Sequence, residues 1–70
     1  MNAAEIVVEL SETGIACNKD SLIDCIGDIL FDLNSNEDQL NLINQLFKIS
    51  PSNLFTEVIL KFKKELVDGN

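Results

Sequence analysis

The chain has 70 residues, of which twelve are acidic, five are lysines and none is arginine or histidine, giving a net charge of −7 at pH 7. This length allows one small domain, residues 1–70, and an apolar content of 46% excludes a chain that is disordered by composition. The acidic balance argues against direct nucleic-acid binding, because such proteins need cations to displace the counterions of phosphate.

The first predicted helix covers about residues 3–12. Its apolar residues recur at spacings of three and four, as on one face of a helix: Ala3, Ile6, Val7 and Leu10. Gly14 can adopt the left-handed conformation that ends many helices. The β-branched run at residues 6–8 leaves a short strand as an alternative.

The second predicted helix covers about residues 20–33. Its apolar residues recur at four, three and four: Leu22, Ile26, Ile29 and Leu33. Either Asn18 or Asp20 can accept a hydrogen bond from the first free amides and so cap the helix. The polar residues 34–36 end it.

The third predicted helix covers about residues 37–49. Its apolar residues form two rows, namely Leu40, Ile43 and Phe47, and Leu42, Leu46 and Ile49. Its start resembles a capping box, formed by Asn36 with Gln39 or by Ser35 with Asp38. Ser50 ends the helix, because a residue that precedes proline disfavours helical geometry.

The fourth predicted helix covers about residues 51–67, with Ser50 as the N-cap and Pro51 at the first helical position. Six residues make its apolar stripe: Leu54, Phe55, Val58, Ile59, Phe62 and Leu66. Its lysines lie towards the negative end of the helix dipole.

These segments predict an all-α fold, a small bundle of three to four short helices with helical-hairpin packing. Three of the helices have apolar faces about two rows wide, and a single short chain can bury only part of that surface. We therefore expect a homodimer. The residues predicted for self-association are Ile26, Gly27, Leu30, Phe55 and Phe62. Gly27 costs a helix about 1 kcal/mol relative to alanine, which the close approach of another helix would justify.

Four aspartates recur at every fourth residue of the second helix: Asp20, Asp24, Asp28 and Asp32. They share one face, which drifts about 40° around the axis at each step. Like charges at this spacing oppose the helix by a few tenths of a kcal/mol per pair. The pattern therefore predicts a docking strip for a basic partner or a mimic of spaced phosphates. The alternative is acidity that only keeps a small apolar protein soluble.

Cys17 and Cys25 are expected to be small, buried or half-buried thiols in a reducing cytoplasm. The N-terminus lacks the basic and apolar regions of a signal peptide, and no apolar run approaches the length that spans a membrane. Two cysteines without histidine cannot complete a four-ligand zinc site. We expect no metal and no cofactor.

Nothing in the sequence backs a nucleophile with a base, so we expect no enzymatic activity. Asp20, Ser21 and Leu22 resemble the Asp-Ser-Leu motif of acyl carrier proteins, in which the serine carries phosphopantetheine. Those proteins have a longer loop before the serine, and Asn18 stands where they have a glycine. We interpret Ser21 as an ordinary residue of the first helical turn.

The chain also resembles the YmgB/AriR group of small biofilm and acid-resistance regulators, called two-component-system connector proteins. Residues 22–30 and 42–46 carry the resemblance, followed by an apolar helix that contains Val58 and Ile59. The resemblance implies a homodimer of helical hairpins that acts as a regulator. It supplies no catalytic or ligand-binding residues.

The sequence thus predicts a non-enzymatic, acidic regulatory or connector protein that binds a protein with a basic surface, in biofilm or stress signalling. One alternative is a phage- or plasmid-type acidic inhibitor that mimics nucleic acid. Others are an acyl-carrier-like protein and a small helical secretion chaperone.

Overall fold

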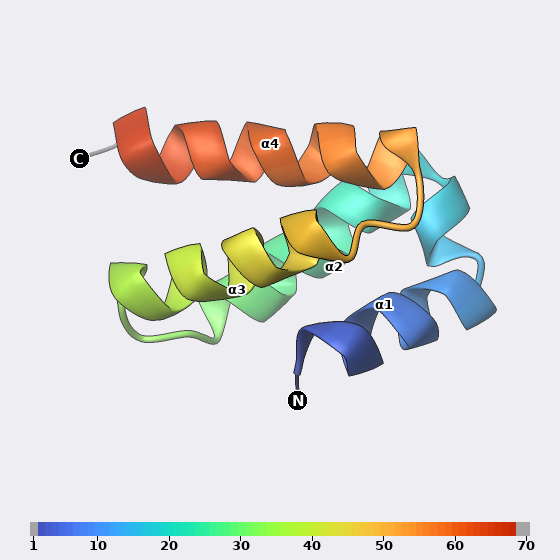
Figure 1. Cartoon of the computed structure of the whole chain (residues 1–70), viewed down its shortest axis with the longest axis horizontal. Helices are drawn as coiled ribbons and strands as arrows, with labels where there is room; N and C mark the ends of the chain where they lie inside the picture. The colour runs from blue at the N-terminus through green and yellow to red at the C-terminus, as the bar shows by residue number, and fades with distance from the viewer. Residues whose placement is uncertain (1, 69–70) are drawn as a thin grey trace.

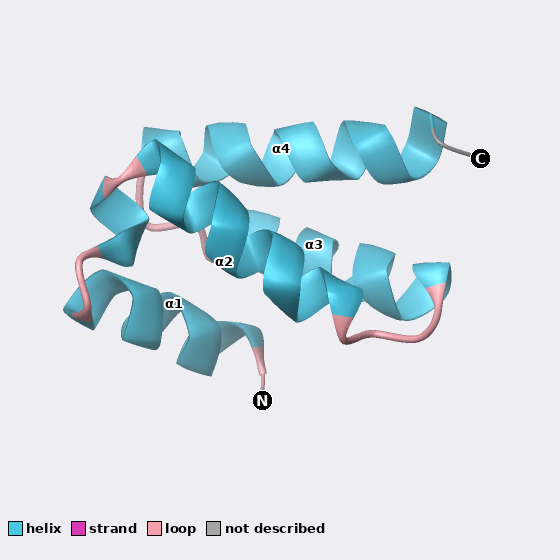
Figure 2. Ribbon diagram, turned by 180° about the vertical axis from the view of Figure 1, so that it is seen from behind, coloured by secondary structure: helices cyan, strands magenta, loops and turns pink. Residues whose placement is uncertain are grey.

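The computed structural model of the chain describes residues 2–68. Its elements are α1 (Ala3–Glu12), the 3-10 helix η1 (Ile15–Cys17), α2 (Lys19–Phe31), α3 (Asn36–Lys48) and α4 (Asn53–Asp68). The predicted all-α bundle is confirmed (Figures 1 and 2). Residues 6–8 lie within α1, so the alternative of a strand there is wrong. No helix within residues 2–68 combines the length and apolarity needed to cross a membrane.

Side-chain caps set the starts of the first three helices. Asn18 Oδ1 accepts a hydrogen bond from the Ser21 amide at 3.0 Å, so Asn18, and not Asp20, caps α2. Ser35 Oγ accepts from the Asp38 amide at 3.1 Å and caps α3. Asn2 acts in the same way at α1. Each cap satisfies an amide that has no partner within its helix.

The start of α4 differs from the prediction by two residues. Ser52 Oγ accepts a hydrogen bond from the Phe55 amide at 3.2 Å, so Ser52 is the N-cap. Ser50 Oγ lies 2.7 Å from Thr56 Oγ1 and 3.0 Å from the Ser52 carbonyl oxygen, which it reaches as a donor. Pro51 is therefore in the turn before the helix. Ser52, and not Ser50, is the N-cap because its hydroxyl oxygen accepts a hydrogen bond from a free amide of the first turn.

The link from α1 to α2 holds a short element that the sequence did not predict. Gly14 has φ +79°, the left-handed conformation expected for it, and it precedes η1. Ala16 of η1 is buried. Three residues are too few to show a periodic pattern, so η1 had no signal in the sequence.

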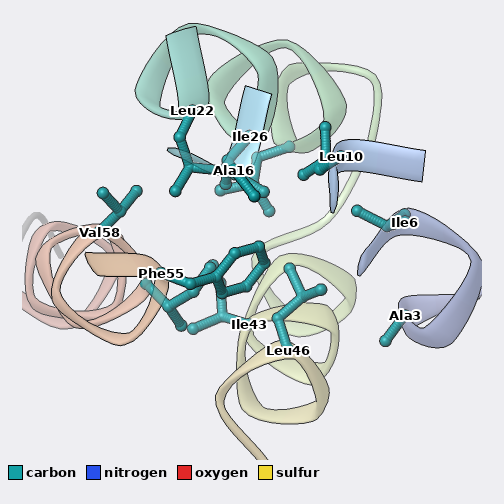
Figure 3. Packing of buried hydrophobic residues seen from close by; sticks show 12 residues of the cluster. Ala3, Ile6, Leu10, Ala16, Leu22, Ile26, Ile43, Leu46, Phe55 and Val58 are labelled. Carbon is teal, nitrogen blue, oxygen red and sulfur yellow. The ribbon is translucent and has the colours of Figure 1, made fainter. Parts of the chain in front are cut away.

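The core is formed by twelve apolar side chains that point inwards from all four helices and η1 (Figure 3). In Figure 3, α2 lies opposite α3, and α4 lies opposite α1. α3 packs on α1 and α4, whereas α2 packs on α4 and η1. This arrangement leaves one long side of α2 uncovered.

The end of α2 is tied to α3 by one side chain. Gln39 Nε2 donates to the carbonyl oxygens of Leu30, at 2.9 Å, and Leu33, at 3.4 Å. The last carbonyls of a helix have no partner within it. Gln39 therefore caps α2 from the neighbouring helix and fixes the α2–α3 connection.

A single chain already buries what a monomer of this size would bury. The radius of gyration is 11.1 Å, against about 11 Å for a compact chain of this length. The accessible surface is 4566 Å², against about 4,400 Å² for a monomeric protein of this mass. The short helices therefore satisfy most of their apolar surface without a second copy.

Candidate interaction surface

The aspartate stripe, defined as Asp20, Asp24, Asp28 and Asp32, lies on the uncovered side of α2. All four side chains are exposed. The buried residues of the same helix are Leu22, Ile26 and Leu30, on its opposite side. The structure therefore places the four carboxylates together on one solvent-facing strip, as their spacing predicts.

No cation within residues 2–68 neutralises the aspartate stripe. The single ion pair of this region joins Lys19 Nζ to Glu57 Oε1 at 3.4 Å, between two exposed side chains. Exposed pairs of this kind contribute little stability. The stripe instead projects an uncompensated negative field into solvent, which attracts a basic surface over about 8 to 10 Å at physiological salt.

Phe31 adds an aromatic ring to the acidic side of α2. Its side chain is 87% exposed, more than any other large hydrophobic side chain described. At about 100° per residue, it lies about 20° around the helix axis from both Asp20 and Asp24. Phe31 was not among the predicted interface residues, although its position out of phase with the buried Leu22 and Ile26 indicates an exposed side chain. Exposed aromatic side chains are frequent anchors of protein interfaces.

The residues predicted for self-association do not form an exposed surface. Ile26, Leu30 and Phe55 belong to the buried core of one chain, because α2 and α4 pack against each other. Gly27 and Phe62 are half-buried and face each other across that same contact. The prediction therefore identified an interface, but it lies between α2 and α4 of one chain.

On its other flank, α2 borders an apolar groove, which we call the α1/α2 groove. It consists of two hollows of about 160 and 300 Å³ that share Ile6 and Ile29. The first hollow is also lined by Glu9, Leu10, Ile15 and Cys25. The second is also lined by Asp32, Leu33 and Leu42. The floor is thus aliphatic, and the acidic residues lie at its edges.

Cys25 lies in this groove and is half-buried, as predicted. Cys17 is exposed, so the prediction of a buried or half-buried thiol is wrong at that position. Both thiols are free. The pKa of Cys25 is raised above its ordinary value of 9.0, mainly because burial penalises the thiolate, and further because Asp28 and Glu9 repel its charge. Cys25 is therefore held as a neutral thiol, which is a poor nucleophile.

The structure, as described over residues 2–68, does not gather Ser21 and the acidic and cysteine side chains into one site. Ser21 is an exposed residue in the first turn of α2, as expected for its ordinary role. Over residues 2–68, no three side chains of the metal-binding types converge on a point that could hold an ion.

The chain has no match among protein-family models, curated proteins or solved structures. The resemblance to the YmgB/AriR group stays a prediction.

Proposed function

We propose that this chain is a non-enzymatic regulatory or connector protein that binds a protein partner with a basic surface through the aspartate stripe. The observation that carries the proposal is the exposed, unpaired row of four carboxylates with Phe31 among them. Such a row costs helix stability, so a role in binding accounts for it better than solubility does, since glutamates spread over the surface would also keep the chain soluble.

Charge and aromatic surface would have separate tasks in such an interface. The carboxylates would speed the encounter and select basic partners, as charge complementarity does in other complexes. Phe31 would supply apolar contact that persists at high salt. The proposed partner therefore has lysines or arginines around an apolar patch.

The test compares two triple variants with the same net charge. Asp24, Asp28 and Asp32 are changed to Asn in the first, and Glu12, Glu37 and Glu65 to Gln in the second. These three glutamates are exposed and lie outside the aspartate stripe. We expect proteins captured from a lysate by the wild type to be retained by the glutamate variant and lost by the stripe variant. Equal capture by both variants would contradict the proposal.

A nucleic-acid mimic is the second candidate, and the regular spacing of the stripe favours it. Aspartates at every fourth residue are about 6 Å apart along the helix axis, a regular row of negative charges as in a phosphate backbone. In that case the captured protein would itself bind DNA or RNA, and nucleic acid would displace this chain from it.

The proposed regulator acts in the cytoplasm, and the resemblance to the YmgB/AriR group suggests biofilm or stress signalling. A homodimer remains part of the proposal, but it must use exposed apolar residues such as Phe47, Ile49 and Leu60. Sedimentation across concentration and salt tests it. A mass of twice 7.8 kDa is expected, and a mass of 7.8 kDa at all concentrations would exclude the dimer.

A further inference from the structure

We propose that the α1/α2 groove receives an amphipathic, basic helix of a protein partner, with two apolar side chains one helical turn apart seated in its two hollows. This inference rests on the proposed function, because the same partner would meet the aspartate stripe. It adds the location of the apolar contact and the pattern of the ligand.

The size and lining of the groove fit apolar side chains. The smaller hollow measures about 160 Å³, and an apolar cavity of about 150 Å³ is large enough for benzene. Its walls are aliphatic and consist of Leu10, Ile15 and Ile29, with the thiol of Cys25 beside them. Each hollow therefore has room for a leucine- or phenylalanine-sized side chain.

The spacing of the hollows fits a helix. The first hollow borders α2 at Cys25 and Ile29, and the second borders it at Ile29 and continues to Leu33, which follows the C-cap Asp32. The two are therefore offset by one turn of α2, about 6 Å. Residues i and i+4 of a helix are separated by the same distance along its axis, which is the anchor spacing of helices that bind in grooves.

The charges at the edges select a basic ligand. Glu9 of α1 lines the first hollow, and Asp32, the C-cap of α2, lines the second. Asp28 lies close enough to Cys25 to raise the pKa of its thiol. No lysine lines either hollow. A helix whose lysines or arginines flank its apolar pair would therefore place opposite charges on both edges.

A partner protein fits this description better than a second copy of this chain. A second copy seated in the groove would bring a chain of net charge −7 against the acidic edges at Glu9 and Asp32, and this repulsion would oppose binding at that site. A basic ligand has the opposite long-range interaction. A second copy becomes one of the outcomes that the experiment below distinguishes.

The experiment uses three synthetic helical peptides of one length, titrated into the full chain and followed by heteronuclear NMR. The first has leucines at i and i+4 flanked by lysines. The second has alanines in place of the leucines, and the third has glutamates in place of the lysines. We expect the first peptide to bind, the second to bind at least about tenfold more weakly, because each lost leucine forfeits its burial, and the third not to bind.

The two cysteines give an internal footprint of the groove. In Cys17→Ser the remaining thiol lines the groove, and in Cys25→Ser the remaining thiol is exposed outside it. The first peptide should slow alkylation of Cys25 at least about fivefold and leave alkylation of Cys17 unchanged. The alanine peptide should protect neither thiol.

Two variants of the chain complete the test. Changing Glu9, Asp28 and Asp32 to their amides should weaken binding of the lysine–leucine peptide at low salt and leave the fold intact. Cys25→Phe should fill the first hollow and reduce the preference for leucine over alanine, because only the second hollow then receives a leucine. If Cys25→Phe does not fold, the amide variant and the protection of Cys25 from alkylation still test whether the peptide binds in the groove.

The outcomes separate this inference from the proposed function. Equal binding of the leucine and alanine peptides, with Cys25 unprotected, would overturn the groove but leave a basic partner on the aspartate stripe. No binding of either lysine peptide would count against both proposals. Binding of the glutamate peptide would overturn the inference that the groove selects a basic helix. Protection of Cys25 that rises with protein concentration alone would assign the groove to a second copy.

Discussion

The ring of Phe62 in α4 lies 3.8 Å from the point that a Cβ atom on Gly27 of α2 would occupy. That separation is an ordinary van der Waals contact, so the contact between α2 and α4 leaves room for a methyl group. Gly27 does not have the left-handed backbone that favours glycine, which within residues 2–68 occurs only at Gly14. Neither packing nor backbone geometry therefore requires glycine at position 27.

Gly27→Ala should stabilise the domain. Alanine restricts the unfolded chain and suits a helix interior, which is worth about 0.5–1 kcal/mol, and its methyl group adds contact with Phe62. For a domain of this size, the melting temperature should rise by about 2–8 °C. Thermal unfolding followed by circular dichroism measures the change.

Gly14→Ala is the matched control. The site has open space around it, with no atom within 4 Å of the added methyl group. Its φ of +79°, however, costs an L-residue about 1–2 kcal/mol. We expect this variant to lower the melting temperature. A loss of stability in both variants would show that Phe62 cannot accommodate the methyl group at position 27.

Neutralising the aspartate stripe should stabilise the fold at low salt. Changing Asp24, Asp28 and Asp32 to Asn removes three like-charge pairs, each worth about 0.2–0.5 kcal/mol, and relieves the charge at the negative end of the α2 dipole. Asparagine and aspartate have similar helix propensity. Urea unfolding should show a gain of about 1 kcal/mol that shrinks as salt screens the charges.

The variant with Glu12, Glu37 and Glu65 changed to Gln controls for net charge. It removes the same three charges, but from three different helices. Its stability should change by less than about 0.5 kcal/mol, as for most surface substitutions. An equal gain in both variants would mean that overall charge, and not the stripe, limits stability.

Gln39→Glu should destabilise the α2–α3 connection. A carboxylate cannot donate to the Leu30 and Leu33 carbonyl oxygens that Gln39 caps, and it adds negative charge at the negative end of α2. We expect a loss of about 1–2 kcal/mol by urea unfolding. Gln45→Glu, on the exposed surface of the same helix, should change stability by less than about 0.5 kcal/mol. Similar losses at both sites would contradict a capping role for Gln39.

Helical periodicity predicted the four helices well, because each helix has one apolar face and that face is buried in one core. Leu22 and Ile26 of α2 and Ile43 and Leu46 of α3 are the buried residues that their spacing indicates. Helix starts were less certain where two residues could act as a cap. At α4 the pair of Ser50 and Pro51 looked like a start, but Ser52 provides the hydroxyl.

The aspartate stripe could be found in the sequence, because a spacing of four places residues on one side of any helix. The groove could not, since its lining comes from α1, η1, α2 and α3. Periodicity shows which residues of a helix are apolar but not whether another helix covers them. For the same reason Ile26 and Phe55 were predicted for self-association, although α2 and α4 of one chain bury them.

Cys25 should make the fold less stable at alkaline pH. Burial, Asp28 and Glu9 raise the pKa of the folded thiol above its ordinary value of 9.0, so as the pH passes 9 the unfolded chain loses the Cys25 proton before the folded chain does. The unfolded state then binds fewer protons, and the free energy of unfolding falls with rising pH until the folded thiol also ionises. At a pH below the pKa of the unfolded thiol, the contribution of Cys25 to the free energy of unfolding is fully present.

Urea unfolding between pH 7 and 10.5 tests this effect in three proteins. Cys25→Ser removes the titrating group, so its stability should fall less steeply above pH 9 than that of the wild type. Cys17→Ser keeps Cys25 and should retain the wild-type slope.

Replacing Asp28 and Glu9 by their amides removes the repulsion of the thiolate and should raise the rate of Cys25 alkylation at pH 8, because the thiolate is the reactive form. If Cys25→Ser retained the full slope, the alkaline loss would not come from Cys25, and the groove would not hold Cys25 as a neutral thiol.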